Sequence, residues 1–142
     1  MSRLFNEAQI ASLATYCTKK PEVLAIYLFG SQARGDFRES SDIDLGFLFT
    51  KTPSLDNHAK ILTDLQSLLA SDKIDIAILN DASPQLQFDS VSEGQLLYRN
   101  MSEEELNQFE LCVIKKYFDT EAFRRVQDLY LKEKILGIPS GF

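Results

Sequence analysis

The sequence predicts an α/β protein in which helices pack on a small mixed β-sheet. Short apolar runs of strand length are separated by amphipathic segments of helix length. Their order is helix, strand, strand, helix, strand and then helices. The composition agrees with a globular domain, because 44% of the 142 residues are hydrophobic and 25% are charged. This length suits one compact domain with its own core.

The first half of the chain contains one helix and two strands. Asn6 and Gln9 form a capping box at the start of a helix that ends before Pro21. Residues 23–29, VLAIYLF, form a continuous apolar run, which is typical of a strand covered on both faces. A polar, glycine-bearing segment separates this strand from a second strand, expected over residues 43–49.

The middle of the chain continues with a helix, a strand, a short helix and a short strand. We expect the first helix over residues 54–71, because Ser54 can cap its start. The third strand is expected over 74–79. A capping serine followed by a first-turn proline predicts a helix over 83–92, and a short strand follows over 95–98.

The C-terminal part is expected to be helical. A capping box at Ser102 begins a long amphipathic helix, and Asp119–Thr120 is expected to restart it as a second one. We therefore predict a core over residues 1–100 and a helical extension of the same domain over 101–142.

The charge and the rare residue types exclude several functions. The net charge of −6 repels phosphate backbones, so we expect no direct nucleic-acid binding. No apolar run reaches the ~20 residues of a membrane span, and the first residues do not resemble a signal peptide. Cys17 and Cys112 match no zinc spacing and are expected to be buried free thiols, with His58 on a helix surface. These features predict a cytoplasmic protein.

Two aspartates stand at the start of the second strand. Asp42 and Asp44 alternate with Ile43, so their side chains share one face, about 7 Å apart at the Cα atoms. Two like charges on one face are unfavourable unless a cation lies between them. Mg²⁺ suits this arrangement, since it uses one or two carboxylates together with substrate phosphates.

The third strand adds a single charge, Asp75, within an apolar run. If the second and third strands are neighbours, Asp75 joins the two other carboxylates. Three carboxylates can hold two metals, or leave one free as a base for an attacking hydroxyl. The alternative is that Asp75 simply faces solvent.

A third feature precedes these carboxylates. Gly30 and Ser31 follow the first strand directly, where a turn can present backbone N–H groups and a hydroxyl to an anion. Taken alone, such a pair describes many ordinary turns. Ten residues separate Ser31 from Asp42.

Together, these residues form the segment GSQARGDFRESSDIDLGF, which resembles the signature of the DNA polymerase β-type nucleotidyltransferase superfamily. The fuller form is similar to the minimal nucleotidyltransferases, the MNT antitoxins that are paired with HEPN toxins. The specific motif covers residues 30–45, and the Asp75 strand and the segment near Tyr98 extend a looser match over nearly the whole chain. The resemblance implies the nucleotidyltransferase fold.

The resemblance also implies a role for each motif residue. Gly30 and Ser31 match the triphosphate-binding turn of the family. Arg34 matches a basic position that assists the triphosphate, although pairing of Arg34 with Asp36 is the structural alternative.

On the metal side, Asp42 and Asp44 match the two metal-binding aspartates. Asp75 matches the third carboxylate, which completes the metal site and helps to activate the acceptor.

By resemblance, the protein is expected to be an Mg²⁺-dependent enzyme that transfers AMP from ATP to a tyrosine hydroxyl of a HEPN-type toxin, which silences the toxin. Two alternatives stay open: transfer to a small molecule such as an aminoglycoside, and a binding antitoxin without catalysis. About forty residues follow Asn100, too few to enclose an acceptor, so a partner protein is expected to supply the other half. Aromatic residues of the C-terminal helix favour a subunit interface there, namely Tyr117, Phe118, Phe123 and Tyr130.

Overall fold

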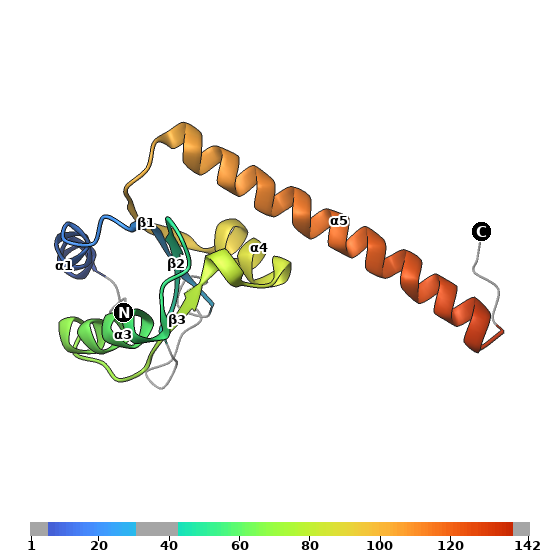
Figure 1. Cartoon of the computed structure of the whole chain (residues 1–142), viewed down its shortest axis with the longest axis horizontal. Helices are drawn as coiled ribbons and strands as arrows, with labels where there is room; N and C mark the ends of the chain where they lie inside the picture. Colours follow the sequence, from blue (N-terminus) through green and yellow to red (C-terminus); the bar gives the residue numbers. More distant parts are fainter. Residues whose placement is uncertain (1–5, 31–42, 138–142) are drawn as a thin grey trace.

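A four-stranded mixed sheet with helices on both of its faces forms the body of the protein (Figure 1). The computed structural model describes residues 6–30 and 43–137. The strand order is β3-β2-β1-β4, in which β1 is antiparallel to both β2 and β4, and β2 is parallel to β3. The predicted fold class is therefore confirmed. The strands are β1 (Val23–Phe29), β2 (Ile43–Phe49), β3 (Ile74–Ile78) and β4 (Gln95–Arg99).

Each predicted helix start is confirmed by a side chain that caps it. Asn6, Ser54, Ser83 and Ser102 each accept a hydrogen bond from a backbone N–H in the first turn of the helix that follows. One 3₁₀ turn, η1 (Leu79–Asp81), shortens the third strand from the expected end. The α-helices are α1 (Glu7–Cys17), α3 (Leu55–Leu68), α4 (Pro84–Glu93) and α5 (Glu103–Ile135).

The expected restart of the C-terminal helix at Asp119–Thr120 is wrong, because α5 is one continuous helix of 33 residues. Both polar side chains interact within the helix instead of capping a new one. The Thr120 hydroxyl donates to the backbone carbonyl of Lys116 at 2.8 Å, and the Asp119 carboxylate lies 3.6 Å from the Lys115 ammonium. No described helix is long and apolar enough to cross a membrane.

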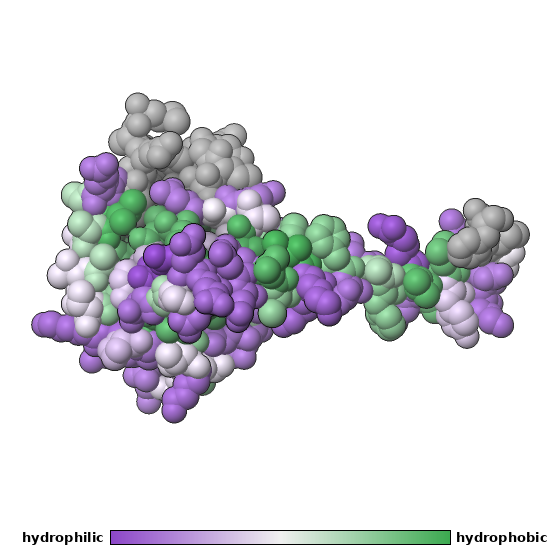
Figure 2. Space-filling view, turned by 90° about the horizontal axis from the view of Figure 1, so that it is seen from above, coloured by the Kyte–Doolittle hydropathy of each residue, from purple (hydrophilic) through white to green (hydrophobic). Residues whose placement is uncertain are grey.

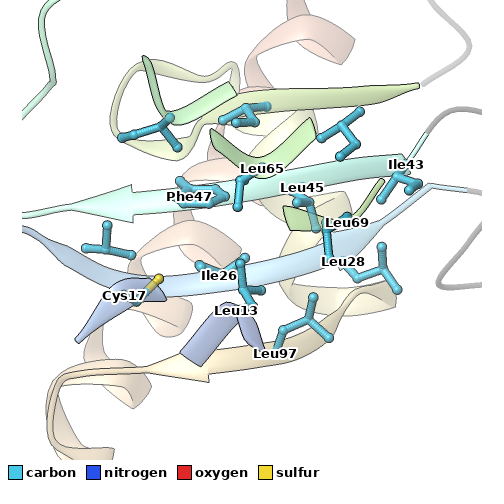
Figure 3. Packing of buried hydrophobic residues seen from close by; sticks show 14 of the residues in the cluster. Leu13, Cys17, Ile26, Leu28, Ile43, Leu45, Phe47, Leu65, Leu69 and Leu97 are labelled. Carbon is cyan, nitrogen blue, oxygen red and sulfur yellow. The ribbon is translucent and has the colours of Figure 1, made fainter. Parts of the chain in front are cut away.

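The two faces of the sheet carry separate cores. The larger one lies between the sheet and helices α1 and α3 (Figure 3), and the smaller one lies on the face covered by α4 and the start of α5. The larger core includes Leu13, Ile26, Leu28, Leu45, Phe47 and Leu65. The smaller core comprises Ala25, Tyr27, Leu48, Leu79 and Leu106.

Two expectations about single residues are corrected. Cys17 is buried as expected, and burial raises its pKa to about 12, but Cys112 on α5 is exposed. His58 is half-buried rather than on the surface. Its Nε2 lies 3.2 Å from the Ile76 carbonyl oxygen, so it joins α3 to the edge strand β3.

A hydrogen bond ties α5 to the centre of the sheet. The Tyr27 hydroxyl, on a side chain only 2% exposed, donates to a Glu110 carboxylate oxygen at 3.0 Å. Burial and this carboxylate both raise the pKa of Tyr27, so the hydroxyl stays protonated and acts as the donor. Farther along, Tyr117 stacks on Phe88 of α4 with ring centroids 4.0 Å apart. Beyond this contact, α5 projects away from the body (Figure 1).

Replacing Tyr27 by Phe should therefore lower the free energy of unfolding by about 1–2 kcal/mol, because a charge-assisted hydrogen bond is lost while the ring is kept. Urea unfolding followed by circular dichroism measures the change. Tyr130→Phe is the matched control, since Tyr130 is 59% exposed on the projecting part of α5 and should unfold as the wild type does. Equal changes in the free energy of unfolding for the two substitutions would contradict a stabilising role for the hydrogen bond between Tyr27 and Glu110.

Candidate nucleotidyltransferase site

The end of β1 and the start of β2 bring Gly30 against Asp44. Phe29, the last residue of β1, is the antiparallel partner of Asp44, and Gly30 follows with a positive φ of 74°. A Cβ atom placed on Gly30 would lie 2.5 Å from the Asp44 carboxylate oxygen Oδ2. Glycine therefore suits this position for two reasons: it readily takes the positive φ, and any larger residue would oblige the Asp44 carboxylate to shift.

The second requirement could not be deduced from the sequence. The sequence suggested only a turn that exposes its amides, whereas the structure places the turn in contact with a carboxylate. That contact depends on the pairing of two strands. No local sequence pattern predicts this contact between the Gly30 turn and Asp44.

Asp44 and Asp75 lie side by side on neighbouring parallel strands. They are direct partners in the β2–β3 register, and strands in a sheet are spaced about 4.8 Å apart. The residues that flank each aspartate along its strand belong to the larger core, so both carboxylates point to the opposite face, the one covered by α4 and α5. Asp44 is half-buried there and Asp75 is exposed. The prediction that these two strands are neighbours is confirmed.

The remaining motif residues, Ser31, Arg34 and Asp42, lie outside the described residues. So does Asp36, the alternative partner of Arg34. Their placement in the site stays a prediction, and with it the convergence of all three carboxylates.

The donor set that the structure does describe fits a hard cation. Two carboxylates stand next to each other, and oxygen ligands of this kind suit Mg²⁺. Within residues 6–30 and 43–137, no three His, Cys, Asp or Glu side chains gather at ligand distance. Those ranges contain two of the three expected carboxylates, and the third, Asp42, would complete the set from the residue next to Ile43.

The fold and these residues define a class of enzyme. The family model described as "Polymerase beta, Nucleotidyltransferase" matches residues 11–103, about two thirds of the chain. The chain belongs to this family and is a nucleotidyltransferase.

Among solved structures, the chain is similar to proteins from toxin–antitoxin complexes. A toxin–antitoxin structure with AMP-PNP matches at 26% identity with a TM-score of 0.73, over 82% of this chain and 93% of the matched one. A mutant MntA toxin–antitoxin structure matches at 30% identity with a TM-score of 0.70, over 86% of this chain and 94% of the other.

A third structure contains a tri-AMPylated Shewanella oneidensis HEPN toxin in complex with its MNT antitoxin. It matches at 24% identity with a TM-score of 0.69, over 84% of this chain and 92% of that chain, and at this identity it supports the fold alone. No curated protein sequence matches the chain.

Proposed function

We propose that this protein is an antitoxin that transfers AMP from ATP to a tyrosine hydroxyl of a cognate HEPN-type toxin, with Mg²⁺ as the metal. One observation carries the proposal: Asp44 stands between the turn at Gly30 and the carboxylate of Asp75. This arrangement supports the proposal because the glycine turn and the two carboxylates, which would bind phosphate and metal, lie together at one end of the strands. The toxin–antitoxin structures to which the chain is similar support a toxin as the partner and ATP as the nucleotide.

In the proposed reaction, the tyrosine oxygen attacks the α-phosphorus of ATP. The new phosphorus–oxygen bond forms as the bond to the β-phosphate breaks, and pyrophosphate leaves. Mg²⁺ would neutralise charge on the phosphates when bound. Asp42 and Asp44 would hold it, and Asp75 would complete the site and take the hydroxyl proton. Asp75 suits the last role because it is exposed on the strand edge, where an acceptor can reach it.

Gly30, Ser31 and Arg34 are proposed to hold the triphosphate. The positive φ of Gly30 turns the backbone sharply at the end of β1, as a phosphate-binding turn requires. The protein as a whole is acidic, so this local set of donors has to overcome a net charge of −6.

The direct test is to incubate the wild-type chain with ATP, Mg²⁺ and its cognate HEPN-type toxin, and then to measure the mass of that toxin. The mass is expected to rise by one or more AMP units, and the toxicity of the protein is expected to fall. A toxin that is silenced without any change in mass would overturn transfer and favour an antitoxin that acts by binding.

Replacement of Ser31 by Ala tests the turn. Loss of one hydroxyl contact to a phosphate should weaken triphosphate binding or transfer by about 1–3 kcal/mol, while the fold is kept. Transfer kinetics at limiting ATP measure this effect, and Ser12→Ala, an exposed substitution on α1, is the control. Unchanged kinetics for Ser31→Ala would remove Ser31 from the site.

A further inference from the structure

Helix α5 exposes more large apolar side chains than any other described element. Leu111, Phe118, Phe123, Val126 and Tyr130 are each 58–66% exposed. Figure 2 shows such apolar patches along the helix where it leaves the body. A contiguous apolar surface of this kind on a protein marks a site of protein–protein contact.

These five residues form one stripe, whereas the exposed Leu131 and Ile135 lie on other sides of the helix. At 100° per residue the five fall within an arc of about 140° on the helix, together with Ala122 and Leu129. We call this set the α5 stripe. It lies roughly opposite to Leu106 and Val113, the buried residues of α5 that face the body. The stripe is interrupted by the ion-paired Lys115 and Asp119 and by Glu133.

Both edges of the α5 stripe are basic. Arg125 and Lys132 border it on one side, and Lys116 and Lys134 border it on the other. Residues 115–135 contain six Lys or Arg against four Asp or Glu, which gives +2. Since the whole chain carries −6, the rest of it carries −8. Residues 115–135 thus form a basic arm, while the rest of the chain is acidic.

This charge pattern indicates which kind of protein binds to the α5 stripe. Two copies of the chain paired along their stripes would bring one basic edge against another in either orientation, which is unfavourable. A partner whose apolar face is bordered by acidic residues would pair with both edges. The like-charged edges therefore argue against a second copy and favour a different protein.

We propose that the α5 stripe is the docking surface for the toxin subunit, and that it takes an apolar helical face of that subunit bordered by Asp and Glu. This inference rests on the proposed function for the identity of the partner. The start of α5 is anchored on the face of the sheet to which Asp44 and Asp75 point, and the α5 stripe lies on the outer side of this helix, where a second subunit can reach it.

Two exposed aliphatic residues of α5 provide a matched test. Val126→Glu places a charge in the α5 stripe, and Leu131→Glu places the same charge on another side of the helix, outside the stripe; both positions are exposed, so both variants should fold. Affinity for the cognate HEPN-type toxin is measured by titration calorimetry. We expect at least a tenfold loss for Val126→Glu and no more than a twofold change for Leu131→Glu. Arg125→Glu should also weaken binding, and should reduce its dependence on salt.

The outcomes separate this inference from the proposed function. If Val126→Glu binds as tightly as the wild type, and the wild type still transfers AMP, the docking surface is wrong and the function stands. If the wild type neither binds nor modifies the toxin, the proposed function fails. Light scattering on the chain alone is the remaining check: a dimer that Val126→Glu dissociates would show that a second copy covers the stripe and would overturn the proposal.

Discussion

Replacing both Asp42 and Asp44 by Asn is expected to abolish AMP transfer and to leave the fold intact. Without these two carboxylates the metal is no longer held, so the charge that develops on the phosphates is not neutralised. Loss of even one such electrostatic contact commonly costs ~10²–10³ in rate. The apo protein should be as stable as the wild type or slightly more so, because the alternation of side chains along a strand predicts that these two like charges share one face.

The assay incubates the double variant with the toxin and ATP-Mg²⁺, and then measures both the mass of the toxin and its inhibition of growth. A double Asp56→Asn and Asp81→Asn variant is the control, since it removes the same charge from exposed positions away from the site; Asp81 follows the far end of β3. Binding to the toxin should persist in both variants. An unmodified but fully silenced toxin would mean that binding alone neutralises it, and would contradict the transfer mechanism.

Gly30→Ala is expected to impair both stability and transfer. A left-handed backbone costs a non-glycine residue about 1–2 kcal/mol, and the new methyl group would press on Oδ2 of Asp44. The carboxylate has to move, so the metal site should lose its geometry. We expect a fall of about 1–3 kcal/mol in the free energy of unfolding and a fall of about tenfold or more in the transfer rate.

The Gly137→Ala variant separates the cost of the left-handed backbone from the effect of contact with Asp44. Gly137 also has a positive φ, 67°, but no atom lies within 4 Å of the position of an added Cβ. It should therefore show the backbone effect without any effect on transfer. Denaturant unfolding and initial rates at saturating ATP measure the two quantities. If Gly30→Ala transfers AMP at the wild-type rate, contact between the turn and Asp44 has no role in catalysis.

Much of the fold could be predicted from short-range patterns in the sequence. The four capping residues are short-range features, because the side chain and the backbone it caps lie within three residues of each other, and each one was readable from the sequence. The strands were readable as well, from their continuous apolar runs. Asp75 stood out for the same reason, as the one charge within such a run.

Long-range features were harder to read. That Asp75 pairs with Asp44 follows from the parallel alignment of two strands separated by α3, and the sequence could state it only as a condition. The polar pair Asp119–Thr120 resembles a helix start, but whether it caps or bonds within the helix depends on a choice that local sequence leaves open. The exposure of Cys112 likewise depends on which side of α5 meets the sheet.

The continuity of α5 has a consequence for how an acceptor would be chosen. A helix of 33 residues is about 50 Å long, and this one contains neither glycine nor proline between its ends. It would therefore be rigid, and a subunit bound to the projecting part of α5 would be held at a fixed distance and angle from the carboxylates. Selectivity for one tyrosine would then come from distance and orientation, with no need for a pocket that reads the surrounding sequence. Inserting one residue within this projecting part would rotate everything beyond it by about 100°, and should redirect transfer even though every contact residue is retained.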